Sequence, residues 1–266
     1  MNIQNISLNN HKKISFGHWN RTVYRNTVSG FQEVVHRNDT SFFRYLKNAQ
    51  DGNSKNYWDS LVQYIGQKYA NTPKVNVYNY ACSDGSEPLS LLASLMTNFS
   101  ENFCKKFGII QARDYDKEAI KNAKKGIYNV YQNEFERIQK CTKHREKDFF
   151  NILDNSFNSE KNYITYKISP KEILTSKINF KVANILKDYK NIKKNNSIVS
   201  AKNFWPYLKK DIPVLVENLS KQMGENSLLI LGDFDERGCR NFNIEIVRLL
   251  IKKGFKKTPI DMVFEK

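Results

Sequence analysis

The sequence of 266 residues has only four cysteines and four histidines, and neither set shows the spacing of a metal site. The cysteines are widely separated with no C-x-x-C pair, so neither a zinc knuckle nor a disulfide framework is indicated. No stretch approaches the ~20 apolar residues of a membrane-spanning helix, and the start lacks the charged-then-apolar pattern of a signal peptide. We therefore expect a soluble, cytoplasmic protein that binds no metal and does not insert into a membrane.

Two common nucleotide-binding motifs are also missing, namely G-x-G-x-x-G for dinucleotides and G-x-x-x-x-G-K-[ST] for phosphates. In their place stands a turn with a single glycine, Gly85, within Tyr80–Pro88. An alternating strand over residues 74–80 leads into the turn, and an amphipathic helix leads out of it. Helix N-termini after such turns bind polar ligand atoms. Because the glycines that a pyrophosphate needs are absent, the turn favours a ligand with amino-acid and nucleoside parts, and S-adenosylmethionine is the obvious candidate.

The second predicted strand, residues 107–113, ends at a pair of aspartates, Asp114 and Asp116. An acidic side chain at the tip of this strand can accept hydrogen bonds from two ribose hydroxyls. Asp116 directly precedes a helical run and suits a helix cap. We therefore assign the ribose to Asp114 and the cap to Asp116.

These residues resemble those of the CheR family of chemoreceptor glutamate methyltransferases. The turn A-C-S-D-G-S-E-P-L-S is similar to the family's usual G-C-S-T-G-E-E-P-Y-S. Four further blocks appear in the family's order: N-D-T-S-F-F-R over 38–44, A-R-D-Y-D and G-I-Y within 112–128, F-K-V-A-N-I-L over 180–186 and A-K-N-F-W-P-Y-L over 201–208. Together they cover roughly residues 38–208, which is more specific than any one motif.

The resemblance implies an S-adenosylmethionine-dependent methyltransferase that acts on a protein side-chain carboxylate. In that interpretation Arg44 would hold the methionine carboxylate and Glu87 the ammonium group, while Tyr207 would lie beside the transferring methyl group. Tyr207 and Arg44 are thus the expected catalytic residues. The expected cofactor-binding residues are Asn38, Thr40, Arg44, Ala81, Gly85, Glu87, Asp114, Asn184, Ile185, Lys202 and Asn203.

Departures from the family pattern and ordinary structural roles leave alternatives open. Ala81 stands where the family has glycine, and Lys202 stands where it has arginine, which keeps the charge but loses the planar fork. Asn184 could instead be satisfied by loop backbone at a strand end. Tyr207 could be an aromatic packed next to Trp205.

The alternation of strands and helices predicts an α/β fold, a class I methyltransferase Rossmann-like doubly wound sheet, with a fifth strand at 227–232 and a last strand at 258–264. Residues 140–179 break this alternation and predict a small inserted β element. In the CheR family a comparable insertion helps to dock the receptor, and an ordinary lid over the cofactor would explain the same residues. We expect a polar arm over residues 1–35 and a methyltransferase domain over 36–266. The 37 residues before Asn38 are too few for the helical domain that usually precedes this block in the family.

The charge balance is 43 basic to 27 acidic residues, a formal net charge of +16, which attracts anionic partners. The lysines are dispersed, however, and no nucleic-acid-binding module is recognisable. A protein substrate is therefore the expected partner, and a nucleic acid remains an alternative. Three functions stay open: a methyltransferase for a protein carboxylate, a methyltransferase of the same fold for RNA or a small molecule, and a protein that binds the cofactor without turnover.

Overall fold

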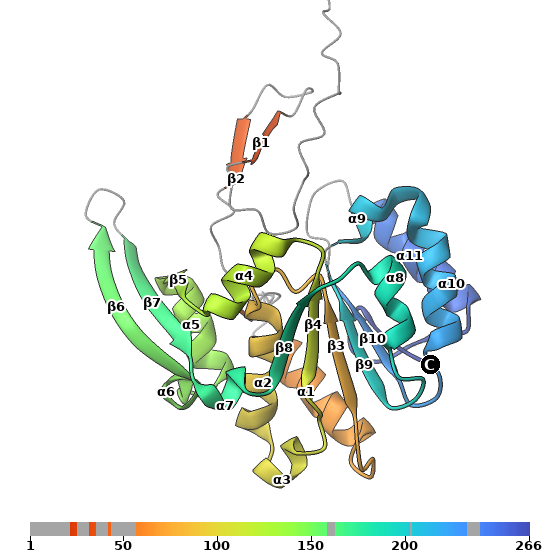
Figure 1. Cartoon of the computed structure of the whole chain (residues 1–266), viewed down its shortest axis with the longest axis horizontal. Coiled ribbons are helices and arrows are strands. Elements are labelled where there is room, and N and C mark those ends of the chain that lie inside the picture. The colour runs from red at the N-terminus through yellow and green to blue at the C-terminus, as the bar shows by residue number, and fades with distance from the viewer. Residues whose placement is uncertain are drawn as a thin grey trace, which may run out of the picture.

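The computed structural model describes residues 22–25, 32–35, 42–43, 57–158, 163–202, 204–232 and 240–266. Its centre is a seven-stranded sheet with helices on both faces (Figure 1). The strand order is β11 (Lys256–Lys257), β12 (Val263–Glu265), β10 (Leu228–Leu231), β9 (Ser197–Ala201), β3 (Asn76–Tyr80), β4 (Ile110–Asp114) and β8 (Ile178–Val182).

Neighbouring strands from β10 to β8 run parallel, whereas β12 is antiparallel to β10. The chain builds the sheet outward from β3, first toward β8 and then, from β9 onward, in the other direction. Strands β9 and β10 are buried along their whole length, as expected for a parallel sheet covered on both faces. The predicted doubly wound α/β fold is confirmed.

Side chains on β3 alternate between two apolar cores, one on each face of the sheet. Val77 belongs to the core that includes α1 (Tyr57–Lys68) and α2 (Ser86–Asn98). Tyr78 belongs to the core that includes α10 (Ile212–Gln222) and α11 (Arg240–Lys252). The shorter helices are α3 (Glu101–Cys104), α4 (Lys117–Lys125), α8 (Ile185–Asp188), α9 (Trp205–Leu208) and the 3₁₀ turns η1 (Tyr189–Asn191) and η2 (Lys209–Asp211).

On α11, Ile246 is buried, whereas Ile244 and Ile251 are 50% and 49% exposed, so one side of the helix packs against the core. One expectation for the C-terminal part is wrong. The last strand does not run from 258 to 264. Residues between β11 and β12 form a turn in which the Ile260 amide donates to the Thr258 hydroxyl oxygen, so the pairing is interrupted.

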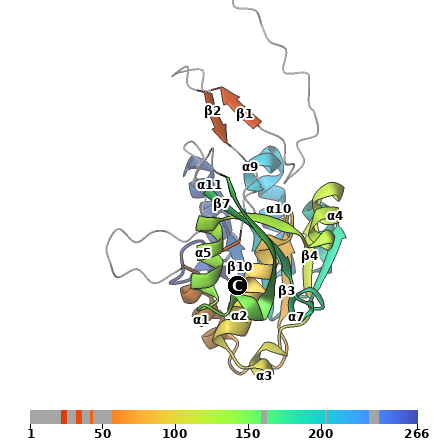
Figure 2. The ribbon, with the colours of Figure 1, turned by 90° about the vertical axis from the view of Figure 1, so that its left-hand side faces the viewer.

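A second, antiparallel sheet is inserted between α4 and β8. It has the order β5 (Tyr128–Tyr131), β7 (Tyr163–Pro170) and β6 (Phe150–Asn158), with α5 (Gln132–Cys141), α6 (Glu146–Phe149) and α7 (Glu172–Thr175) beside it. The sheet therefore begins at Tyr128, earlier than the predicted 140. Strands β6 and β7 extend away from the central sheet (Figure 1), and in the rotated view the inserted sheet faces the viewer (Figure 2). Within the predicted polar arm, β1 (Thr22–Arg25) pairs with β2 (Gln32–Val35).

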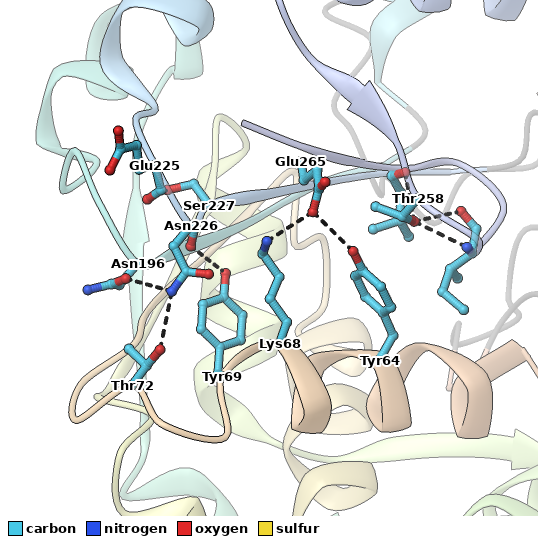
Figure 3. A network of polar contacts seen from close by, with 12 residues as sticks. Tyr64, Lys68, Tyr69, Thr72, Asn196, Glu225, Asn226, Ser227, Thr258 and Glu265 are labelled. Atoms are coloured by element: carbon cyan, nitrogen blue, oxygen red, sulfur yellow. Dashed lines mark hydrogen bonds and ion pairs between the residues drawn. The ribbon is translucent and has the colours of Figure 1, made fainter.

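A polar network joins α1 to the edge of the central sheet at which β9 and β10 begin (Figure 3). Glu265 Oε2 accepts from the Lys68 Nζ at 3.0 Å and from the Tyr64 hydroxyl at 3.1 Å. Burial and the neighbouring Glu265 raise the pKa of Tyr64 to about 12, so its hydroxyl stays a donor. The Tyr69 hydroxyl donates to the carbonyl of Asn226, just before β10. This network lies where β9 and β10 begin, so it does not occupy the carboxyl ends of the parallel strands.

Among the described residues, no helix has the length and apolarity needed to cross a membrane.

Candidate active site

The predicted site residues converge at the carboxyl ends of three adjacent strands. Strand β3 lies between β4 and β9 and leads into the turn that begins at Ala81. Asp114 is the last residue of β4, and Lys202 directly follows β9. Open α/β sheets bind ligands at such a point, where connections on the two sides diverge and leave a crevice.

The turn after β3 has an unusual backbone, because Ala81, Ser83 and Gly85 all have positive φ values of 56°, 50° and 86°. This left-handed conformation costs alanine and serine energy but suits glycine. A Cβ atom added to Gly85 would lie 2.8 Å from the ring of Phe180 on β8. Gly85 therefore serves both the turn and its close packing against the neighbouring strand.

Helix α2 begins at Ser86, with Gly85 as its cap. Pro88 is the third residue of this helix. Its missing amide hydrogen is still harmless, since the first amides of a helix have no partner within the helix.

Asp114 ties this turn to β4. Its Oδ2 accepts from the Ser83 amide and its Oδ1 from the Asp116 amide, both at 2.8 Å. The side chain is buried, and burial raises the pKa of Asp114 to about 6 although the two amides oppose the shift. Asp116 caps α4 by accepting from the Glu118 amide, so its predicted role is confirmed.

Glu87, in the first turn of α2, is held through one carboxylate oxygen. Its Oε1 accepts from Asn79 Nδ2 at 2.7 Å and from the Ser200 hydroxyl, and it lies 3.4 Å from Lys202 Nζ. Asn79 and Ser200 are both buried. Within the part of the chain that the structure describes, no donor is bonded to Oε2. The carboxylate is thus fixed in place with one oxygen available to a cation.

Helix α1 contributes aromatic residues that the sequence analysis missed. The Nζ of Lys202 lies 4.7 Å from the centre of the Trp58 ring and 5.9 Å from that of Tyr57. Such contacts stabilise a cation in a site poor in water. The signal was present in the spacing of Trp58, Leu61, Val62 and Ile65, which recur at helical intervals and are all buried.

The residues after β8 make structural contacts. Asn184 Oδ1 accepts from the Leu186 amide at 2.9 Å and so caps α8, which is the alternative left open for this residue. Ile185 is only 7% exposed and belongs to a core. Two exposed apolar residues that were not predicted lie nearby: Tyr115, after β4, is 61% exposed, and Val182, paired with Asp114, is 38% exposed.

The block at 38–44 is described at its two phenylalanines. Phe42 and Phe43 are fully buried, and the Phe43 amide donates to the Ser90 hydroxyl of α2 at 2.9 Å. This part of the block is therefore anchored to the helix that carries Glu87. The structure does not describe four of the predicted site residues: Asn38, Thr40, Arg44 and Asn203. For Tyr207 it describes the backbone, which lies in α9, but not the side chain.

The family model described as "CheR methyltransferase, SAM binding domain" matches residues 38–243. No curated protein matches the sequence. Similar solved structures include precorrin 8w decarboxylase from Methanobacterium thermoautotrophicum (10% identity over 82% of this chain and 81% of that one, TM-score 0.39). Another is the N-methyltransferase NodS from Bradyrhizobium japonicum (11% identity over 78% of this chain and 93% of that one, TM-score 0.37). A third is a TehB-like SAM-dependent methyltransferase from Corynebacterium glutamicum (13% identity over 82% of this chain and 91% of that one, TM-score 0.39).

Proposed function

Since the chain belongs to the family of CheR methyltransferases with a SAM-binding domain, we propose that it methylates a side-chain carboxylate of a protein. It is an S-adenosylmethionine-dependent methyltransferase. The acceptor class and the role of each residue are the proposal, and residues 36–266 form the proposed catalytic domain.

The described side chains fit S-adenosylmethionine by their chemistry. Glu87 offers a carboxylate oxygen without a described donor, which suits the ammonium group of the methionine part. Asp114 stands at the tip of the strand next to the turn, where a carboxylate can accept from ribose hydroxyls. Each Asp114 oxygen already accepts one amide, and a carboxylate has about four acceptor positions. The donor and acceptor set is therefore compatible with the cofactor.

When bound, S-adenosylmethionine supplies an electrophilic methyl group. The chain's contribution is to bind and orient, and alignment of two reactants can lower a barrier by about 7 kcal/mol or more. We assign Glu87, Asp114 and the turn to binding. Arg44 would hold the methionine carboxylate, and Tyr207, whose backbone lies in α9 shortly after β9, would orient the acceptor. The other members of the proposed set are Asn38, Thr40, Ala81, Gly85, Asn184, Ile185, Lys202 and Asn203.

The observation that supports a protein acceptor is the inserted sheet. Among the described strands, β6 pairs only with β7, so it forms one edge of this sheet. Its side chains are exposed over residues 151–157, including Leu153 at 50% and Phe157 at 61%. An exposed edge strand can pair with an extended peptide through backbone hydrogen bonds. A macromolecular acceptor could therefore be held beside the domain while its carboxylate reaches the site.

Methyl transfer from radiolabelled S-adenosylmethionine tests this proposal. The purified protein is incubated separately with fractionated protein and with RNA from cells that naturally express it, and the label is followed in each fraction. Base-labile label on protein supports a carboxyl ester. Label in RNA would instead favour the alternative to which the net charge of +16 points, and base-stable label on protein would contradict a carboxylate acceptor.

A further inference from the structure

The inserted sheet also touches the turn of the candidate active site. The Tyr128 hydroxyl, on β5, donates to the carbonyl oxygen of Asp84 at 2.8 Å, and this contact is buried. Asp84 lies between Ser83 and Gly85, at the centre of the left-handed turn. Burial raises the pKa of Tyr128 well above its usual range, so the hydroxyl is protonated and can donate at neutral pH.

The ring of Tyr128 also contacts the block at 38–44. The Phe42 ring packs edge-on against Tyr128, with ring centres 4.9 Å apart, and against Phe150 of β6 at 5.4 Å. The Phe42 amide donates to Glu134 Oε1 at 3.0 Å, and Glu134 lies on α5 of the insertion. Strands β5 and β6 and helix α5 of the insertion therefore all contact Phe42. Phe42 belongs to the block at 38–44, where the family match begins.

We propose that Tyr128 is a positioning residue for cofactor binding: its hydroxyl fixes the backbone of the turn at Asp84, and its ring fixes the segment at Phe42. This inference rests on the proposed function, because it assumes that the turn contacts the cofactor. The inserted sheet then serves the cofactor site directly, in addition to any contact with the acceptor.

The physical reason lies in the strain of the turn. Positive φ values at Ala81 and Ser83 are unfavourable, so surrounding contacts must maintain them. The Asp114 carboxylate holds the turn from β4 through the Ser83 amide, and Tyr128 holds it from β5 of the inserted sheet through the Asp84 carbonyl. Without the hydroxyl, this buried carbonyl loses its partner and the turn can relax. Cofactor binding would then have to restore the strained conformation.

The test compares two variants that each lose one hydroxyl from the inserted sheet. Tyr128→Phe keeps the ring that packs on Phe42 but cannot donate to Asp84. Tyr166→Phe is the matched control, because Tyr166 on β7 stacks on Phe135 at 4.2 Å and has no described contact with the turn. Affinity for S-adenosylhomocysteine, the demethylated product, is measured by calorimetry. We expect the dissociation constant to rise about fivefold or more in Tyr128→Phe and to stay unchanged in Tyr166→Phe.

Hydrogen exchange gives a second readout that separates loosening of the turn from a general loss of stability. Amides over residues 81–86 should exchange faster in Tyr128→Phe than in the wild type, and S-adenosylhomocysteine should restore their protection. If Tyr128→Phe lowers the melting temperature but keeps wild-type affinity and wild-type exchange in the turn, the inference is overturned and the proposed function stands. If the wild-type protein itself fails to bind S-adenosylhomocysteine, the proposed function fails first and this inference fails with it.

Discussion

The Nζ atom of Lys202 lies 3.4 Å from the Oε1 atom of Glu87, and the two side chains are only 3% and 18% exposed. The pair joins the end of β9 to the first turn of α2, across the point where the connections of the sheet diverge. Each charge compensates the other where water is scarce. The pair therefore links β9 to α2, and it offsets the negative charge of Glu87 in the site.

Replacing Lys202 by methionine should lower the free energy of unfolding by about 3 kcal/mol, because the half-buried Glu87 carboxylate loses its counter-charge. Lys202→Arg keeps the charge and should cost less than about 1 kcal/mol. Urea denaturation at neutral pH measures both values. Lys121→Met is the matched control, since its ion pair with Glu118 is exposed and should contribute less than about 0.5 kcal/mol. Equal losses at positions 202 and 121 would contradict the buried pair.

Cofactor affinity should depend on pH through Asp114, whose pKa burial raises to about 6. Protonation turns one carboxylate oxygen into a donor, so the ionised form accepts more strongly from two hydroxyls. The dissociation constant of S-adenosylhomocysteine should therefore rise by up to about tenfold for each pH unit below 6. Asp114→Asn should bind more weakly at pH 8 and lose this dependence. A wild-type affinity that is constant between pH 5 and pH 8 would remove Asp114 from the binding site.

The same carboxyl group affects stability with the opposite sense. Because the pKa of Asp114 is higher in the folded state than its ordinary value of 3.8, the folded protein binds this proton more tightly. Its contribution to the free energy of unfolding is thus present at low pH and is lost as the pH rises from about 4 to about 6. Comparison of the unfolding curves of the wild type and Asp114→Asn over that range isolates it.

Ala81→Gly should stabilise the protein by roughly 1 kcal/mol, because alanine at a φ of 56° is strained and glycine is not. Ala93→Gly, in the buried centre of α2, is the control and should destabilise by roughly 1 kcal/mol or more. Chemical denaturation of both variants gives the sign directly. A loss of stability in Ala81→Gly would show that the alanine side chain contributes packing that exceeds the strain.

Lys68 should stabilise the protein only while Glu265 is ionised. Hydrogen bonding from Lys68 is the largest cause that lowers the pKa of Glu265 below its ordinary value of 4.5. We expect Lys68→Met to cost about 0.5 to 1 kcal/mol at pH 7, since the pair is partly exposed. This difference from the wild type should shrink as the pH falls below the ordinary value. A difference that stays constant down to pH 3 would mean that Lys68 acts through packing alone.

Arg44→Ala should weaken cofactor binding, whereas Tyr207→Phe should mainly slow turnover. The first change removes the proposed partner of the methionine carboxylate, and a charge-assisted hydrogen bond contributes about 1.5 to 3 kcal/mol. The second removes only the Tyr207 hydroxyl, which is proposed to lie beside the transferring methyl group. Calorimetry with S-adenosylhomocysteine and the radiolabel assay separate the two effects. Unchanged affinity in Arg44→Ala would overturn the role assigned to that residue.

The sequence predicted the elements whose signals are local. Asp116 was placed as a helix cap because an acceptor before a helical run bonds to the next amides, and the structure confirms it. The turn at Gly85 was predicted because it lies between an alternating strand and an amphipathic helix, and Gly85 has a positive φ in the structure. Helix α1 was missed although Trp58 and Ile65 follow helical spacing, and the inserted sheet was placed too far along the chain because β5 pairs with β7, which lies more than 30 residues away.

By itself, the sequence determined the doubly wound fold, the strand, turn and helix that begin the site, and the family to which the blocks belong. These features depend on periodicity and on contacts between neighbours in the chain. Only the tertiary structure decided which groups meet: that Asn79, Ser200 and Lys202 all converge on one oxygen of Glu87, and that Tyr128 reaches Asp84. Except for the contact between Asn79 and Glu87, these contacts join residues far apart in the chain, so they depend on how strands pair and how side chains fill the remaining space, which spacing in a sequence does not encode.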